Sequence, residues 1–267
     1  MKTISQVVKY FSNISYLKSH IILTIGIACI LIARQPQVLL HADLFKEDAF
    51  VFFKLSYEIN FISAVTSIYA GYLHVLPHAL ARLCFLLPLE WIPTSYVLVS
   101  ISISALSISF FHSKIFSHVV PHNWLRGFAS IVMALMPMGE ATVTLNHIQW
   151  FTLLYGCLFS ICAVPSSRIY KITLFLFYYL AAWSTPALIV TAPVIVIRAI
   201  RSKDKYDRIL WALSLTMLGL YFFICHSSAV GQSLHISYIV SLLNAYIFRV
   251  VCIFTLGLEV GVSLLNS

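Results

Sequence analysis

Long apolar stretches occur along the whole chain, and they constrain its fold more than any other feature. Runs of about 15 to 25 residues carry few charged side chains and show no strict alternation of apolar and polar positions. In lipid every backbone N–H and C=O must be paired inside the protein, so only helices and closed barrels span a bilayer. Barrel strands alternate apolar and polar residues. The pattern therefore predicts an all-α, polytopic membrane protein.

The charged residues agree with this prediction. They make up 10% of the 267 residues, whereas a soluble globular chain usually has about 25%. The net charge of +8 is spread through short loops and forms no basic and aromatic patch, so we expect no nucleic-acid partner. The cysteines lie in apolar runs without CxxC spacing, which indicates small buried hydrophobic side chains. They are Cys29, Cys84, Cys157, Cys162, Cys225 and Cys252.

Apolar length, proline and charge define the expected helices of a single transmembrane domain, residues 1–267. The first apolar core is followed by Arg34 without a small-residue cleavage pattern, so we expect a retained first helix. The bundle has about seven to eight spans, because two of the segments, 125–138 and 187–200, are short for a bilayer. The expected helices are residues 16–35, 93–112, 125–138, 147–164, 170–186, 187–200, 208–226 and 236–258.

Lysine and arginine concentrate in cytoplasmic loops of membrane proteins, and this rule orients the bundle. With a cytoplasmic N-terminus, the basic residues that fall clearly outside are Arg34, Lys46, Lys54 and Arg82. The outer side then receives most of the acids, including Glu58 and Glu90. We therefore expect an integral membrane protein with its N-terminus in the cytoplasm.

The longest connection, residues 37–92, is predicted to be an outer, periplasmic loop with helices at the membrane surface. Loops of this length are uncommon unless they have a function. Asp43 is placed to cap a short helix that begins at Leu44, and a second helix is expected from Pro77 to about Leu87.

Two adjacent acids in this loop, Glu47 and Asp48, stand in an otherwise aromatic and aliphatic run. Neighbours on a helix point about 100° apart, so the two carboxylates are not expected to share one task. Either acid could accept a proton from a sugar hydroxyl as a general base or bind a divalent cation near a phosphate. The alternative is that both merely solvate the end of an interfacial helix.

The segment that follows the acids mixes aromatic, glycine and histidine residues. Gly71 permits close approach of the backbone, and Tyr72, His74, His78 and Arg82 are candidates for binding a substrate phosphate or sugar. Ordinary anchoring at the membrane surface would use the same residue types. His74 and His78 lack a secure third ligand, so the sequence assigns no metal site.

A second group of polar residues is expected at the outer ends of later helices. Asn146 and Gln149 offer amides to sugar hydroxyls, Trp150 offers an indole face for stacking, and Glu140 needs water or a partner near the membrane. Helix packing and an aromatic belt would account for them equally well. The segment 183–186, Trp-Ser-Thr-Pro, is expected to break a helix.

These elements together resemble the GT-C superfamily of polytopic glycosyltransferases, which use polyprenyl-phosphate-linked sugars. The resemblance is strongest to bacterial members that modify cell-surface polysaccharides, and it covers roughly residues 35–200. His78 stands where the resemblance leads us to expect arginine. The elements that carry it are the Glu47–Asp48 pair, the YAGYLHVLP stretch 69–77, Asn146-x-x-Gln149-Trp150 and the WSTP turn 183–186.

The resemblance implies a GT-C-like bundle that moves a sugar from a polyprenyl-phosphate donor to a cell-envelope glycan or lipid acceptor. Transfer would take place on the non-cytoplasmic face of a bacterial inner membrane, with inversion at the anomeric carbon and Asp48 or Glu47 as the base. Cations or a divalent metal ion must face the departing phosphate. The chain is short for such enzymes, and the resemblance leaves three alternatives: a C-terminally truncated, a minimal or an inactive member. The candidate cations are Arg34, His74, His78 and Arg82.

Two other classes of function fit the same sequence. A lipid or solute transporter or flippase would use the broken helices near Pro137 and Pro186 to surround a site at the membrane midplane. Transporters usually place ionisable groups in mid-helix, whereas the acids here lie in outer loops. A non-catalytic membrane subunit would tolerate replacement of Glu47 and Asp48.

Overall fold

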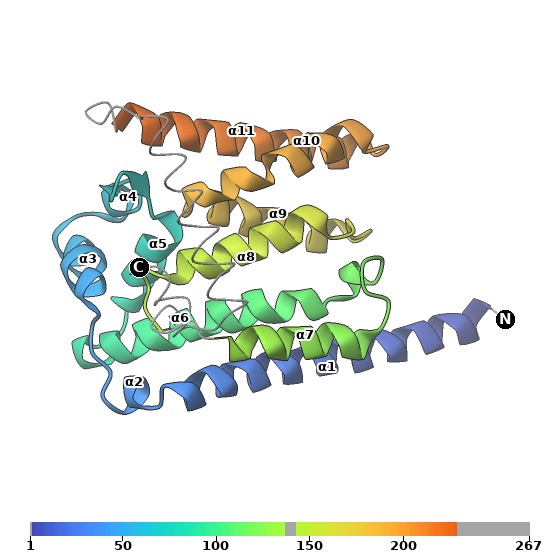
Figure 1. Cartoon of the computed structure of the whole chain (residues 1–267), viewed down its shortest axis with the longest axis horizontal. Helices are drawn as coiled ribbons and strands as arrows, with labels where there is room; N and C mark the ends of the chain where they lie inside the picture. Colours follow the sequence, from blue (N-terminus) through green and yellow to red (C-terminus); the bar gives the residue numbers. More distant parts are fainter. Residues whose placement is uncertain (1, 137–142, 229–267) are drawn as a thin grey trace, which may run out of the picture. The chain divides into compact units, whose positions relative to one another are not determined.

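The computed structural model describes residues 2–136 and 143–228 (Figure 1). The chain divides into two compact units, residues 1–225 and 226–267, and every site discussed below lies in the first. The expected helix 236–258 lies outside the described residues. Within residues 2–136 and 143–225 the regular elements are helices and one short hairpin, so the all-α prediction is confirmed for these residues.

Long helices run side by side through the first unit (Figure 1). Helix α6 lies centrally and contacts α1, α7 and α8, and α8 in turn packs against α9. The expected helices at 93–112, 125–138, 147–164 and 170–186 are confirmed to within a few residues. The long helices are α1 (Lys2–Arg34), α6 (Ile92–Ser109), α7 (Asn123–Leu135), α8 (Ile148–Ile161), α9 (Arg168–Ala182), α10 (Ala192–Arg201) and α11 (Lys205–Ser228).

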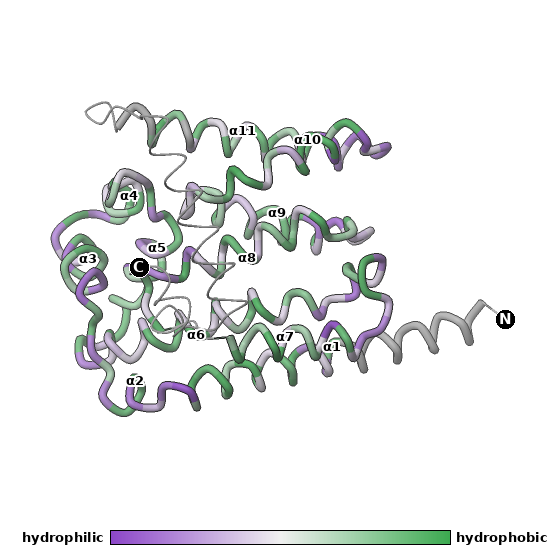
Figure 2. The backbone as a smooth tube through the Cα atoms, in the orientation of Figure 1, coloured by the Kyte–Doolittle hydropathy of each residue, from purple (hydrophilic) through white to green (hydrophobic). Residues whose placement is uncertain are grey.

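Three helical segments are long and apolar enough to cross a membrane: Leu17–Arg34, Leu89–His112 and Lys205–Cys225. Apolar residues cover much of these segments in Figure 2. Two further apolar helices, Val75–Cys84 and Ile148–Ile161, are shorter than the roughly 20 residues that a span requires. The described residues therefore form a helical membrane protein with three candidate spans, and the larger bundle of seven to eight spans stays a prediction.

Short elements fill the long connection between α1 and α6. Residues 42–45 are not helical, and the Asp43 carboxylate accepts a bond from the N–H of the adjacent Leu44 at 2.7 Å instead of capping a helix there. This corrects the predicted start at Leu44. The elements are α2 (Gln37–Leu40), the π-helix η1 (Asp48–Phe53), α3 (Lys54–Glu58), α4 (Phe61–Val65), β1 (Ile68–Tyr69), β2 (Tyr72–Leu73), α5 (Val75–Cys84) and η2 (Leu89–Trp91).

Strands β1 and β2 form an antiparallel hairpin that the sequence did not predict. Ala70 and Gly71 form its two-residue turn with φ angles of 53° and 85°. Positive φ at both positions is typical of the type I′ turn, which matches the twist of the paired strands. Among the described residues, nothing lies within 4 Å of the position of a Gly71 Cβ. Gly71 therefore serves the turn, and its role in close approach of the backbone to a ligand stays a prediction.

Helices α8, α9 and α11 are joined by a cluster of buried aromatic side chains. Phe159, Phe175 and Trp211 pack with ring centroids 4.7 to 5.2 Å apart. The Arg198 guanidinium of α10 lies 4.4 Å from the Trp211 ring centroid and donates to the Ser160 carbonyl at 2.7 Å. Three-residue 3-10 turns, η3 (Phe110–His112) and η4 (Lys114–Phe116), and the longer η6 (Pro186–Thr191) complete the connections.

The cysteines of the described residues are free, as predicted, but they are not all buried. Cys84 and Cys162 are buried, Cys157 and Cys225 are half-buried, and Cys29 is exposed. Cys29 lies on α1, where few residues of the segment Leu17–Arg34 are buried. The interpretation of Cys29 as a buried side chain is therefore wrong. Cys252 lies outside the described residues.

We expect Gly156→Ala to lower the free energy of unfolding by about 1–3 kcal/mol, because it overpacks a filled core. A Cβ at this position on α8 would collide with the fully buried Leu188 of η6. Thermal unfolding in detergent measures the effect. Gly219→Ala is the matched control, because nothing lies within 4 Å of the added Cβ. Equal melting temperatures for the two variants would contradict the packing described here.

Candidate functional site

The Asp48 carboxylate joins the outer segment to the start of α8. Its Oδ1 atom accepts from the Asn146 N–H at 3.0 Å and its Oδ2 atom accepts from the Leu145 N–H at 3.1 Å. The side chain is 2% exposed and begins the π-helix η1. Single π-turns occur frequently at functional sites. Two backbone donors therefore fix the orientation of a buried carboxylate.

Burial raises the pKa of Asp48 to about 6. The N–H groups of Asn146 and Leu145 lower the pKa, and the nearby Glu47 raises it further, but loss of water around the carboxylate is the largest cause. A base works best when its pKa lies close to the operating pH. Asp48 is therefore mostly ionised at neutral pH and still basic enough to take up a proton.

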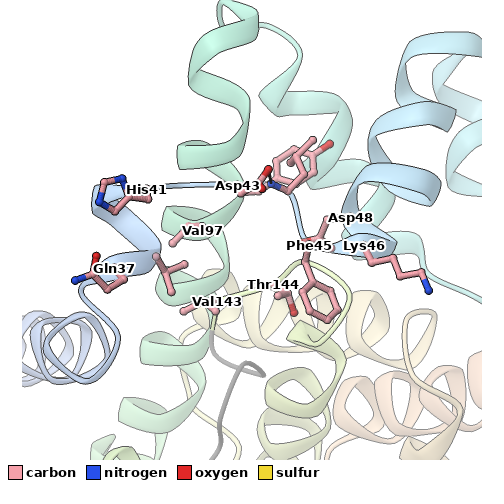
Figure 3. A pocket seen from close by; sticks show the side chains of 12 residues that line it. Gln37, His41, Asp43, Phe45, Lys46, Asp48, Val97, Val143 and Thr144 are labelled. Carbon is pink, nitrogen blue, oxygen red and sulfur yellow. Dashed lines mark hydrogen bonds between the residues drawn. The ribbon is translucent and has the colours of Figure 1, made fainter.

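Asp48 lines a cavity of about 460 Å³ that is shown in Figure 3. The walls come from the segment around α2, the start of η1, helix α6 and the residues just before α8. This volume lies within the usual range for small-molecule sites. The polar groups on its walls are Gln37, His41, Asp43, Lys46, Asp48 and Thr144, with the phenol of Tyr96.

The charges of this cavity are arranged by depth. His41, Asp43 and Lys46 are exposed, whereas Asp48 and Tyr96 are buried. A ligand would therefore meet both signs of charge at the rim and a carboxylate beside a phenol in the interior. Cations at the rim suit an anionic group, and the buried acceptors suit groups that donate hydrogen bonds.

Glu47 lies outside the set of described residues that line the cavity. It is half-buried, and its Oε2 atom is enclosed without a hydrogen-bond partner among the described residues. The two adjacent acids thus have different surroundings, as the spacing of neighbours on a helix predicts. The structure places Asp48, and not Glu47, where it can meet a ligand in this cavity.

The histidines of the outer segment lie in a separate, buried aromatic cluster. Phe52 packs against both His74 and His78 with ring centroids 5.7 and 4.8 Å away, and Tyr72 stacks on His74 at 4.1 Å. His78 shares a 3.1 Å hydrogen bond with Ser67 Oγ. Burial lowers the pKa of both histidines to about 4, so both are neutral at pH 7. Neither histidine lines the cavity, and neither carries the positive charge of a phosphate-binding cation.

The three residues of the predicted Asn-x-x-Gln-Trp element lie in three different surroundings. Asn146 uses its backbone N–H to hold Asp48. Gln149 is buried and accepts from the Tyr72 hydroxyl at 2.7 Å, which joins α8 to the hairpin. Trp150 is 51% exposed and is not among the residues that line the cavity. Glu140 lies outside the described residues.

Both predicted arginines satisfy backbone carbonyls. Arg34 donates to the carbonyls of Ala134 and Met136, at 2.7 Å each, and so completes the C-terminal end of α7. Arg82 donates to the Ser56 carbonyl at the α3 segment. Neither arginine lines the cavity, so the proposed set of phosphate-binding cations is not assembled there.

The WSTP turn breaks the helix as predicted and also holds the outer segment. Helix α9 ends at Ala182, and the Leu76 N–H of α5 donates to Ser184 Oγ at 2.8 Å. The Val75 N–H donates to the Trp183 carbonyl at 3.3 Å. The first N–H groups of a helix have no partner within that helix. At the start of α5, two such groups are paired by residues more than 100 positions later in the chain.

Sequence reasoning missed His41, Lys46 and Tyr96 as wall residues. The position of Tyr96, where a phenol interrupts the serine and isoleucine pattern of an expected span, was the available signal. Within residues 2–136 and 143–228, no group of three His, Cys, Asp or Glu side chains is placed to hold a metal ion. The described donors therefore do not form a site for the divalent cation considered above.

Comparisons with known proteins supply no relative whose role could be proposed for this chain. No family model, no curated protein and no solved structure matches the chain. The function proposed below is consequently argued from the cavity and from the resemblance in the sequence.

Proposed function

We propose that the protein is a membrane glycosyltransferase of the GT-C type, which moves a sugar from a polyprenyl-phosphate donor to a cell-envelope glycan or lipid. The observation that carries the proposal is the buried Asp48 carboxylate, oriented by two backbone N–H groups on the wall of a 460 Å³ cavity. A carboxylate in this setting has the chemistry of a general base.

In the proposed reaction Asp48 takes the proton from an acceptor hydroxyl. The hydroxyl oxygen forms a bond to the anomeric carbon as the bond from that carbon to the phosphate oxygen breaks. The electron pair of the broken bond leaves with the polyprenyl phosphate, and the proton stays on Asp48 until water removes it. A single displacement of this kind inverts the anomeric carbon.

The hydrogen bonds to Asp48 support this role. The Leu145 and Asn146 N–H groups occupy one lone pair on each carboxylate oxygen, and each oxygen keeps further acceptor capacity. The carboxylate is thus oriented before a substrate arrives. General bases positioned in this way contribute about 10²- to 10⁴-fold to a rate.

The departing phosphate needs positive charge, and the Lys46 ammonium group at the rim replaces the cations expected from the sequence, with His41 as a further hydrogen-bond donor. Both line the cavity and both are exposed. Lys46 is two residues from Asp48, so the base and the rim cation belong to one short segment. This arrangement suits a donor whose phosphate stays at the rim while its sugar enters the cavity.

The proposed location is the outer side of a bacterial inner membrane, with the N-terminus of α1 in the cytoplasm. The cavity adjoins the segment that follows Arg34, at the end of α1 opposite Lys2. Acids gather in this outer segment and bases in the loops at the other ends of the helices, as the sequence predicts for this orientation.

Transfer of label from a panel of polyprenyl-phosphate sugars to cell-envelope acceptors tests the proposal, in membranes with and without the protein. We expect transfer of at least one sugar that requires the protein. His41→Ala and Lys46→Ala should each raise the donor KM about tenfold, the loss expected for one charge-assisted contact of about 1.5 kcal/mol. Lys54→Ala is the matched control, because this exposed lysine does not line the cavity.

Two outcomes would count against the proposal. Absence of transfer by folded protein, supplied with every donor and its native envelope, would favour a transporter or a non-catalytic subunit. Transfer with an unchanged donor KM in both rim variants would remove His41 and Lys46 from the phosphate site.

A further inference from the structure

The phenol of Tyr96 is buried in the wall of the cavity without a hydrogen-bond partner among the described residues. Its side chain is 1% exposed, and its hydroxyl oxygen is enclosed. Two other tyrosines of the described residues are buried to a similar degree and both are paired. Tyr178 bonds Thr191 Oγ1 at 2.8 Å, and Tyr221 donates to the Leu73 carbonyl at 3.3 Å. Of these three buried tyrosines, Tyr96 is therefore the one whose hydroxyl lacks a hydrogen-bond partner among the described residues.

The core around Tyr96 does not need a hydroxyl. The buried side chains clustered with it include Phe52, Ile92 and Leu145, and the Cys84 thiol and the Asp48 carboxylate lie within electrostatic range. Phenylalanine would fill the same space without the cost of burying an unpaired polar group. Such groups are rare in native proteins, and each calls for an explanation such as a ligand that supplies the missing bond.

The surroundings of the hydroxyl define the chemistry of that ligand. Tyr96 lines the same cavity as Asp48 and lies within range of its charge. A second anion would be repelled there, whereas a neutral hydroxyl can accept a bond from the phenol and donate one to the carboxylate. A sugar carries several such hydroxyls, whereas an apolar ligand would leave the Tyr96 hydroxyl unpaired.

We propose that Tyr96 binds a sugar hydroxyl at the buried end of the cavity and thereby restricts that end to neutral polyols. The inference rests on the proposed function, because it assigns the buried end to the sugar and the charged rim to the phosphate. It also makes Tyr96 a specificity-determining residue, which interacts with the substrate and takes no part in proton transfer.

The test compares the full-length protein with its Tyr96→Phe variant by thermal unfolding in detergent. Each is measured alone, with polyprenyl phosphate, and with a panel of polyprenyl-phosphate hexoses. A ligand that binds the folded state raises the melting temperature by mass action, so the difference between the two lipids reports recognition of the sugar. Tyr57→Phe is the control, because that tyrosine is exposed and outside the cavity.

For the natural protein we expect at least one hexose-bearing lipid to stabilise more than polyprenyl phosphate does. Tyr96→Phe should melt at the same or a higher temperature without ligand, lose the additional stabilisation, and bind that lipid about tenfold more weakly. Tyr57→Phe should behave as the natural protein. This result supports the inference even if no sugar is transferred, in which case the proposed transfer reaction alone fails.

Three results would overturn the inference. One is a natural protein that no hexose stabilises beyond the effect of polyprenyl phosphate. Another is a Tyr96→Phe variant that keeps the full sugar-dependent stabilisation. A third is a variant that melts at a clearly lower temperature without ligand, because the hydroxyl would then have a structural partner.

Discussion

Asp48→Asn is expected to lower the rate of sugar transfer at least about 100-fold, the lower end of what a general base contributes. Asparagine cannot take up the proton of the acceptor hydroxyl. Its amide also brings a donor to a position where the Leu145 and Asn146 N–H groups both require an acceptor. Initial rates of label transfer, normalised to folded protein in the membrane, measure the effect.

The pH dependence of the natural protein separates a base from a merely structural carboxylate. Because the pKa of Asp48 is about 6, kcat/KM should rise as the pH increases through about 6 and level off near neutrality. The folded-state pKa lies above the ordinary value of 3.8. The stability contributed by this carboxyl is therefore complete below about pH 4 and is lost as the pH rises through 6, by up to about 3 kcal/mol.

Glu47→Gln is the matched control for Asp48→Asn, since it removes the adjacent charge but leaves the cavity wall intact. It should keep most of the activity and shift the rising limb of the pH profile slightly downward, because Glu47 raises the pKa of Asp48. An Asp48→Asn variant with full activity would refute the role of Asp48 as the base. A profile that is flat from pH 5 to 8 would do so as well.

Asp207→Ala is expected to lower the free energy of unfolding by about 3 kcal/mol. Asp207 of α11 forms an ion pair with Lys171 of α9, and the Lys171 side chain is only 6% exposed. Loss of the partner leaves a buried ammonium group unpaired, which typically costs 3–5 kcal/mol. The lower value applies because Asp207 keeps some exposure. Thermal or denaturant unfolding in detergent measures it.

Replacement of both partners tests whether the cost comes from the unpaired charge. The double variant Lys171→Met with Asp207→Leu should recover most of the lost stability, because it leaves no buried charge. Lys203→Ala, at an exposed position near the same helix end, should change stability by less than about 0.5 kcal/mol. A double variant as unstable as Asp207→Ala would show that the ion pair has a different role.

Local signals in the sequence predicted the helices well. Proline and charge placed the boundaries of α8 and α9 within a few residues, and the WSTP turn ends α9 as expected. These features depend on neighbours within a few positions, so a single sequence contains them. The hairpin at residues 68–73 was missed because its strands have two residues each, which is too short for any periodic pattern.

The candidate site was predicted only in part, because its assembly depends on contacts that are distant in sequence. The acidic pair was found, but nothing local distinguishes Asp48 from Glu47. The backbone of residues 145 and 146 makes that distinction by bonding one carboxylate and not the other. The histidines were grouped with the acids because they are near in sequence, whereas they pack against Phe52 in a separate aromatic cluster.

Asp48 and the start of α5 are bonded by residues far along the chain, and this sequence separation determines when the outer segment can be completed during synthesis. Asp48 is bonded by residues 97 and 98 positions later, and Leu76 by a residue 108 positions later. A ribosome adds about 5–20 residues per second, so each partner emerges roughly 5 to 20 s after the group that it pairs. During this interval the acid has only water to solvate it, and the start of α5 has no cap. The cavity is therefore a late product of biosynthesis, which forms only after residues 145 and 146 have been synthesised and can bond Asp48.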